Sequence, residues 1–172
     1  MLFDRDDFAL FDLPRRFALD ATELAARRRI VQAEVHPDRF AAGGAAAQRA
    51  AMQWAVRVNE AFERLKDPLK RAAYLCELAG VPIRAEDNTA MPPEFLMQQM
   101  AWREGLDDAV TPAAVEAIAR DIDGHRQAAY AELTRALDDA ADHEGAARQV
   151  RALMFVERFA ADVADRLESM EA

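Results

Sequence analysis

The sequence predicts an all-α protein built from two helical domains, and three features support this. Only six of the 172 residues are glycine, whereas Ala, Leu, Arg and Glu, which favour helices, are used heavily. Apolar residues recur at helical spacing, and no segment sustains the alternation typical of a strand. One polar, proline-rich stretch, VPIRAEDNTAMPP, interrupts the helical pattern. We therefore expect a first domain over 1–80, a linker over 81–93 and a second domain over 94–172.

The first domain opens with a short apolar element and a helix. The element FALFDL, at 8–13, is closed by Pro14, because proline lacks the backbone N–H that a helix interior needs. Either Asp20 or Thr22 can cap the following helix, which is expected over 21–35.

Two further helices complete the first domain. The third helix is expected over about 45–66, where apolar residues repeat at i, i+4, i+7, i+11 and i+14: Ala51, Ala55, Val58, Phe62 and Leu65. The fourth is expected over 68–79, opened by a proline. Its inward residues should be Ala72, Leu75 and either Leu78 or Ala79.

Three helices are expected in the second domain. Pro92-Pro93 opens the first, which ends near Asp108, and Thr111-Pro112 opens the second with a cap followed by an N1 proline. The third runs over 144–170. The second and third carry regular apolar stripes, formed by Val115, Ile118, Ile122, Ala129, Leu133 and Leu137 and by Val150, Leu153, Val156, Ala160, Val163 and Leu167. Such stripes predict a three-helix bundle.

Charge is distributed unevenly between the two halves. Residues 1–80 hold 13 Lys and Arg against 12 Asp and Glu, a net charge of +1, whereas residues 81–172 hold 9 against 19, a net charge of −10. The acidic half argues against nucleic-acid binding, which requires neutralisation of phosphates. It suits either a basic protein partner or simply a well-solvated surface.

Several other classes of protein are disfavoured. No run approaches the ~18 apolar residues that span a membrane, and the acidic start does not resemble a secretory signal, so we expect a cytoplasmic protein. The single cysteine, Cys76, allows no disulfide framework. His36, His125 and His143 are too far apart in sequence to suggest a metal site, and no nucleotide-binding motif is present. We expect neither metal nor cofactor.

The loop after the second helix carries the first candidate site. Arg27-Arg28-Arg29 leads into His36-Pro37-Asp38-Arg39. The simplest interpretation is a proline that ends a helix, beside a solvated basic face. Alternatively, the histidine and the carboxylate form a docking site. The last possibility is a helical acid–base enzyme that uses His36 and Asp38. The sequence indicates no further group that would orient the base.

The residues around this loop resemble a J-domain. Val58-Asn59-Glu60-Ala61-Phe62 and Leu65 follow the basic helix and the HPD triplet, and then come Asp67-Pro68, Arg71 and Tyr74. The opening (Asp6 to Asp20), RAAYLCELAG (71–80) and FLMQQMAWREGLDD (95–108) are similar to the HscB family of iron–sulfur co-chaperones, over essentially the whole chain. The acidic three-helix second half distinguishes this family from general DnaJ-type proteins.

This resemblance implies docking without catalysis by this chain. The J-domain would bind the ATPase domain of an HscA/DnaK-type chaperone and accelerate its ATP hydrolysis, with Asp38 suited to a charge-assisted hydrogen bond to an arginine. Arg39 stands where Lys is commoner, and Arg28 where an aromatic residue is frequent, which should slightly loosen helix packing. The chaperone-binding residues are expected to be His36, Pro37, Asp38, Arg39, Arg27 and Arg29.

A second candidate site follows from the helical wheel of the helix that begins at Pro93. Phe95, Trp102 and Leu106 share one face, whereas Leu96, Met97 and Met100 lie largely on the other. A helix in a three-helix bundle that is apolar on two faces shows one face to a partner or packs it on the first domain or the linker. On the last helix, Phe155 also points away from the core stripe.

In the HscB family the equivalent patch binds an IscU-type iron–sulfur scaffold. The implied scaffold-binding residues are Leu96, Met97, Met100, Arg103, Glu104 and Phe155, with Arg103 and Glu104 at the rim. Ala101 stands where an acidic residue is usual. A J-domain protein serving a different client remains the main alternative.

Overall fold

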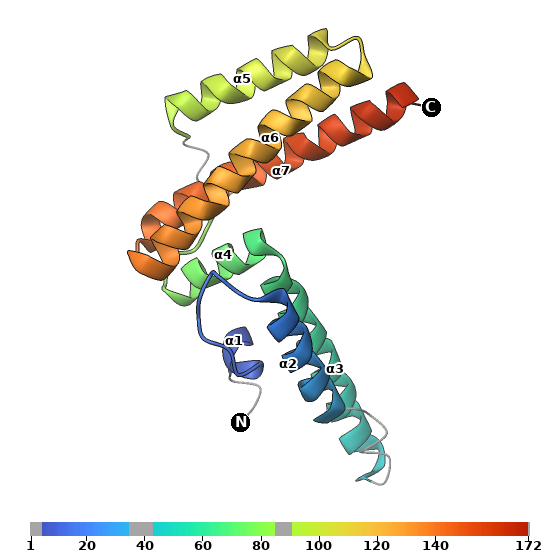
Figure 1. Cartoon of the computed structure of the whole chain (residues 1–172). Helices are drawn as coiled ribbons and strands as arrows, with labels where there is room; N and C mark the ends of the chain where they lie inside the picture. The colour runs from blue at the N-terminus through green and yellow to red at the C-terminus, as the bar shows by residue number, and fades with distance from the viewer. Residues whose placement is uncertain (1–4, 35–42, 85–90, 172) are drawn as a thin grey trace. The chain divides into compact units, whose positions relative to one another are not determined.

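The computed structural model describes residues 5–34, 43–84 and 91–171, and within these ranges it is helical without any strand. The predicted all-α class is therefore confirmed. The chain divides into two compact units, Met1–Leu75 and Cys76–Ala172. Figure 1 shows a helical hairpin in the first unit and a bundle of long helices in the second. In the described part of the chain, no helix is both long and apolar enough to span a membrane.

The first unit contains helices close to the expected ones. They are α1 (Asp7–Leu10), α2 (Ala21–Glu34), α3 (Gly44–Lys66) and α4 (Pro68–Leu78), whose last residues belong to the second unit. Helices α2 and α3 lie side by side as an antiparallel hairpin (Figure 1). Asp20, rather than Thr22, caps α2, because its Oδ1 accepts the backbone N–H groups of Thr22 at 2.7 Å and Glu23 at 3.3 Å.

The core of the first unit lies where α1 and its following loop meet α2, α3 and α4. Its fully buried side chains include Phe8, Phe11, Leu24, Val58 and Leu65. One expectation was wrong: Leu78 and Ala79 are both exposed, and the buried residues of α4 are Ala72, Leu75 and Cys76. These three follow the i, i+3, i+4 spacing of a single helix face, and α4 ends before the next turn could continue it.

A buried carboxylate ties α1 to α3 and α4. Asp7 is 0% exposed. Its Oδ2 accepts a hydrogen bond from Arg64 at 2.7 Å, and Arg57 lies 2.6 Å from Oδ1 as an ion pair. The backbone N–H of Asp7 donates to the Tyr74 hydroxyl at 3.0 Å, and burial raises the pKa of this hydroxyl. Phe8 stacks on the Tyr74 ring, so α1 is held in place by both charge and packing.

We expect Asp7→Asn to destabilise the first unit by about 2 kcal/mol or more, because two arginines would lose their buried counter-charge. The matched control is Asp12→Asn. Asp12 also pairs with an arginine, but its side chain is 88% exposed, so its loss should cost less than about 0.5 kcal/mol. Its positive φ of 54° is tolerated by asparagine. Urea denaturation followed by circular dichroism measures both, and equal losses would contradict the structural role of Asp7.

The second unit contains a bundle of three helices. These are α5 (Pro93–Asp108), α6 (Pro112–Thr134), extended by the π-helix η3 (Arg135–Asp139), and α7 (His143–Glu171). Thr111 caps α6 as expected, its hydroxyl accepting the Ala114 N–H at 3.3 Å. The π-helix was not anticipated. The two apolar stripes meet along α6 and α7, where Val115, Ile122, Leu133, Val150, Leu153, Val156 and Val163 are buried.

The segment before α5 is partly packed on α7. Ile83 is only 7% exposed, and the buried Arg151 of α7 donates to its carbonyl oxygen at 3.0 Å. The first residues of the predicted linker therefore contribute to the second unit. The limits of the two functional domains remain a prediction.

Cys76 is buried at the end of α4 and belongs to the second unit. Its thiol donates to the carbonyl oxygen of His143 at 3.7 Å. Burial, with a smaller contribution from the Glu77 carboxylate, raises the pKa of the thiol from 9.0 to about 11. The folded protein therefore keeps this proton at pH values where the unfolded chain loses it.

This raised pKa predicts a loss of stability in alkali. Below pH 9 the thiol is protonated in both states and adds no pH dependence. Between pH 9 and 11 the unfolded chain alone releases the proton, which should cost about 1 kcal/mol at pH 10. The free energies of unfolding of wild type and Cys76→Ala, compared at pH 8 and pH 10, measure the effect. An unchanged difference between the two proteins would contradict the raised pKa.

Candidate partner-binding sites

The basic helix α2 presents the described part of the first candidate site. Arg27 is engaged within the unit, since its guanidinium lies 3.0 Å from Asp12 and 4.0 Å from Glu23. Arg29 is exposed. The four residues His36, Pro37, Asp38 and Arg39 lie outside the described residues. Of the two described arginines, Arg29 is therefore the less constrained by charge.

Arg28 occupies the position where, by the resemblance, an aromatic residue is frequent. Its guanidinium carbon lies 4.1 Å from the centre of the Phe62 ring, and its Nη2 donates to Asn59 at 3.1 Å. Gln32 donates to the same Asn59 oxygen at 3.3 Å. The guanidinium thus stacks on α3, and these contacts bridge α2 and α3 where an aromatic side chain would have packed.

An apolar side chain accompanies the basic face and was missed by sequence reasoning. Ile30 is 56% exposed and lines a cleft of about 300 Å³ together with Arg27, Val31 and Trp54. A helical wheel could have found it, because Leu24 and Val31 share one face of the helix and Ile30 lies about 100° from Val31. The surface beside the arginines is therefore partly apolar.

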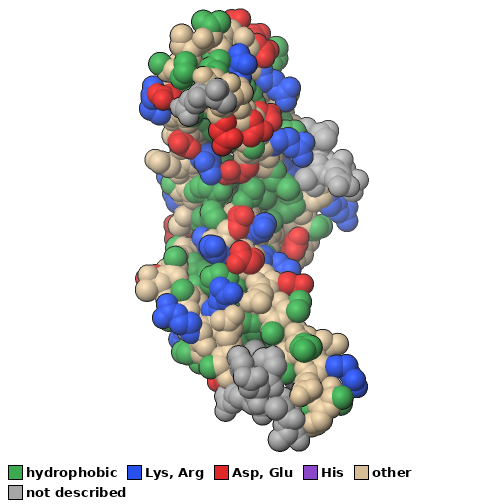
Figure 2. Space-filling model, turned by 90° about the vertical axis from the view of Figure 1, so that its right-hand side faces the viewer, with side chains coloured by type: hydrophobic (Ala, Val, Ile, Leu, Met, Phe, Trp, Pro, Cys, Tyr) green, Lys and Arg blue, Asp and Glu red, His purple; other side chains and the backbone are tan. Residues whose placement is uncertain are grey.

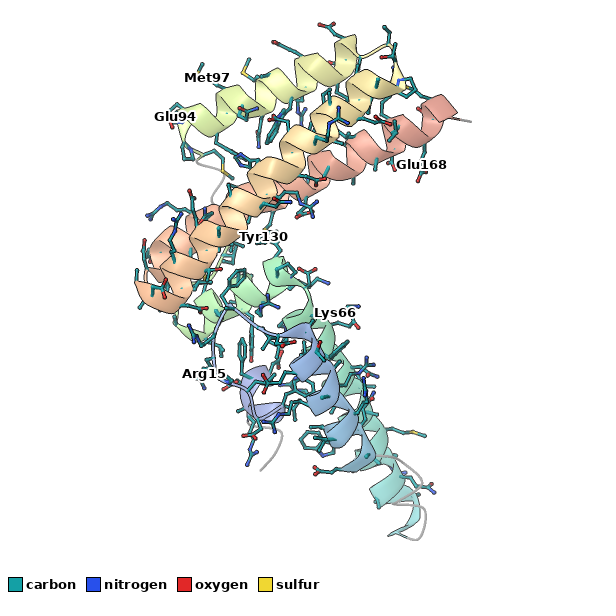
Figure 3. The ribbon with its side chains drawn as sticks, viewed as in Figure 1. Arg15, Lys66, Glu94, Met97, Tyr130 and Glu168 are labelled. Carbon is teal, nitrogen blue, oxygen red and sulfur yellow. The ribbon has the colours of Figure 1, made fainter. Side chains whose placement is uncertain are left out.

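The outer face of α5 forms the second candidate site. Leu96, Met97 and Met100 are 45%, 69% and 61% exposed, whereas Phe95 and Trp102 on the inner face are 9% and 4% exposed. Figure 3 shows Met97 projecting from α5 away from α6 and α7. The two apolar faces expected from the helical wheel are thus present in the structure, and the binding role of the outer one remains a prediction.

Aromatic contacts hold α5 with this face outward. The Trp102 indole N–H donates to Asp121 of α6 at 2.6 Å. The His125 ring of α6 lies 5.2 Å from the Trp102 ring, edge on, and 6.0 Å from the Phe95 ring. On the α7 side, Phe159 stacks on Trp102 at 6.2 Å. Because Phe95 and Trp102 are held in this way, these contacts oppose a rotation of α5 that would bury its outer residues.

The other predicted residues of this site come from α5 and α7. Arg103 and Glu104 are exposed on α5, and Phe155 of α7 is half-buried rather than fully exposed. Arg103 and Phe155 both line a groove of about 70 Å³ between α5 and α7, which we call the α5–α7 groove. Arg158 lines it too and was not singled out from the sequence. The apolar side chains of Leu96, Met97 and Met100 lie outside its lining.

An ionic network fixes α6 against α7 behind this site. Arg126 donates to Glu157 at 2.9 Å and to Asp123 at 3.0 Å, and Tyr130 donates to the same Glu157 oxygen at 3.1 Å. Partial burial alone would lower the pKa of the Arg126 guanidinium, but the Glu157 and Asp123 carboxylates outweigh it and raise this pKa. The arginine therefore stays charged and keeps the two helices in register.

Electrostatics alone do not single out a site on the surface. On the face seen in Figure 2, acidic and basic side chains are interspersed with apolar ones. Within residues 5–34, 43–84 and 91–171, no three His, Cys, Asp or Glu side chains gather as metal ligands would. In the second unit, the surface features that stand out are instead the outer face of α5 and the groove beside it.

Comparisons with known proteins agree with this arrangement. The family description "HSCB C-terminal oligomerisation domain" matches residues 91–164. The co-chaperone protein HscB homologue of Burkholderia mallei is 53% identical over 167 residues, covering 95% of each chain. That of Burkholderia multivorans is 52% identical with the same coverage.

Solved structures show the same fold. The chaperone HscB from Vibrio cholerae matches with a TM-score of 0.82 and 33% identity, covering 98% of this chain and 100% of that one. Human HscB matches with a TM-score of 0.89 and 25% identity, covering 98% and 84%. The Jac1 co-chaperone of Saccharomyces cerevisiae matches with a TM-score of 0.75 at 20% identity, covering 95% and 94%, and so supports the fold alone.

The helical hairpin unit and the three-helix bundle therefore define the class of J-domain co-chaperones. The level of identity and its coverage go further: this chain belongs to the HscB co-chaperone family. This membership supports a co-chaperone role in iron–sulfur cluster assembly.

Proposed function

We propose that this chain is a non-catalytic co-chaperone with two binding sites. Residues 1–80 stimulate the ATPase of an HscA/DnaK-type chaperone, and residues 94–172 bind an IscU-type scaffold and deliver it to that chaperone. The observation that carries the proposal is the outer face of α5. It remains apolar and exposed on a helix whose inner face is already packed.

In the first domain, the docking surface combines Arg29 and the HPD triplet. Asp38 offers a carboxylate for a charge-assisted hydrogen bond to an arginine of the ATPase domain. Arg29, exposed on α2, supplies attraction for acidic groups of that partner. Arg27 contributes less than its charge suggests, because Asp12 and Glu23 already neutralise it in part.

In the second domain, the docking surface is the outer face of α5 together with Phe155. Leu96 and the two methionines provide apolar area that loses water on binding, and methionine adapts to an irregular partner surface. The anchoring of Trp102 and Phe95 pre-organises this face, which lowers the entropic cost of association. Arg103 and Glu104 flank it and can set orientation.

Wild-type protein tests the proposal directly. Added to an HscA-type chaperone, it should raise the rate of ATP hydrolysis, and the scaffold should raise that rate further when all three proteins are present. A chaperone ATPase that does not respond would remove the first half of the proposal. If stimulation occurs but the scaffold fails to bind, a J-domain protein for a different client becomes the better assignment. Turnover of a small substrate without any chaperone would favour the acid–base enzyme.

A further inference from the structure

The α5–α7 groove has an apolar floor and a charged rim. Trp102, Phe155 and Phe159 provide aromatic carbon at the floor, while Arg103 of α5 and Arg158 and Asp162 of α7 provide charge. At about 70 Å³ the groove is far below the roughly 300 Å³ at which small-molecule pockets begin. Its size therefore suits the end of one inserted side chain.

The rim is locally basic in an acidic part of the chain. Arg103 and Arg158 approach from different helices, and among the described residues neither is in an ion pair. By contrast, Arg126, Arg120 and Arg135 of this unit all pair with carboxylates. Asp162 is the one acidic residue in the lining, which leaves the rim with an excess of one positive charge.

The groove is continuous with the surface proposed for the scaffold. Arg103 and Phe155 belong to both, and Arg103 lies one helical turn beyond Met100 on α5. A partner that covers the outer face of α5 and reaches Phe155 therefore meets the groove and its arginines.

We propose that the α5–α7 groove receives an apolar side chain of the scaffold that has a carboxylate beside it, and that Arg158, with Arg103, binds this carboxylate. This inference rests on the proposed scaffold binding. A guanidinium suits the role because its planar fork can donate two hydrogen bonds to one carboxylate. Arg158 is thereby a specificity-determining residue, since a basic group at that point of a partner would meet the excess positive charge of the rim, and a neutral group would leave it unpaired.

The test is the affinity of an IscU-type scaffold for Arg158 variants, measured by titration calorimetry. Arg158→Glu should weaken binding about tenfold or more, because reversal places two carboxylates together. Arg158→Lys, which keeps the charge, should stay within about threefold of wild type. The matched control, Arg166→Glu, makes the same charge change at another exposed position of α7, outside the groove, and should change affinity less than about twofold.

The outcomes separate this inference from the proposed function. Wild type that does not bind the scaffold removes both. If wild type binds the scaffold and both Arg158→Glu and Arg166→Glu bind it as tightly as wild type does, the proposed role of the groove is overturned. The scaffold function is then unaffected. Equal weakening by the two reversals would show a general charge effect and would also overturn it.

The identity of the occupant has its own test. Among scaffold variants in which single surface carboxylates are changed to Lys, one should restore binding to Arg158→Glu while weakening binding to wild type. Failure of every such variant would overturn the proposed carboxylate. Sedimentation of the co-chaperone alone should be unaffected by Arg158→Glu. A change in self-association would instead assign the groove to a second copy of this chain.

Discussion

His36→Gln and Asp38→Asn should each abolish stimulation of the chaperone ATPase while leaving scaffold binding intact. Asparagine keeps the size of Asp38 but removes the negative charge, so the hydrogen bond to a partner arginine loses its charge assistance. Glutamine cannot carry the positive charge that histidine can take up near neutral pH. Each change exchanges one polar side chain for another of similar size, so the helical fold should stay intact.

Steady-state ATP hydrolysis by the chaperone, measured over a range of co-chaperone concentrations, gives the result. Asp165→Asn, at an exposed position of α7, makes the same chemical change and should stimulate like wild type. Circular dichroism should show equal helicity for all variants. Undiminished stimulation by either loop variant would sink the docking role of this triplet.

Leu96→Ala combined with Phe155→Ala should weaken scaffold binding about 100-fold. Each truncation removes apolar contact area at the centre of the proposed interface, and a central anchor contributes about 1.4 kcal/mol or more, a factor of ten each. Stability should change little for Leu96, which is 45% exposed in the free protein. ATPase stimulation in the absence of scaffold should be unchanged, because the first unit is untouched.

The control for this double variant is Met52→Ala with Val110→Ala. Those side chains are 61% and 85% exposed, so the control removes exposed apolar area from positions outside the proposed surface. Its affinity for the scaffold should match wild type. If the two double variants bind equally well, Leu96 and Phe155 serve packing and the scaffold contacts another face.

Helix positions were predictable from local sequence because their signals act within a few residues. Thr111 followed by Pro112 defines the start of α6, and the proline at 68 opens α4. The two faces of α5 also followed from helical spacing alone. Local rules failed at η3, where the chain adopts a π-helix, and at the end of α4, where burial of Cys76 replaced the expected burial of Leu78.

The candidate chaperone site could be inferred only from sequence, because the HPD triplet lies outside the described residues. The candidate scaffold site was partly predictable, since Leu96, Met97 and Met100 share a face of one helix. The sequence identified Phe155 as a candidate but did not predict that its side chain is half-buried. Nothing in the local sequence marked Arg158 as a candidate, because its role depends on α5 lying beside α7.

By itself, then, the sequence determined the all-helical class, the two helical regions and the apolar outer face of α5, since composition, caps and periodicity are properties of neighbouring residues. The family was indicated by the resemblance of its motifs. Only the tertiary structure decided the partners of Asp7, which come from α3 and α4, and the stacking of Arg28 on Phe62. It alone brought Arg103 and Arg158 to one groove. These contacts join residues dozens of positions apart, and packing between helices, rather than any local preference, selects them.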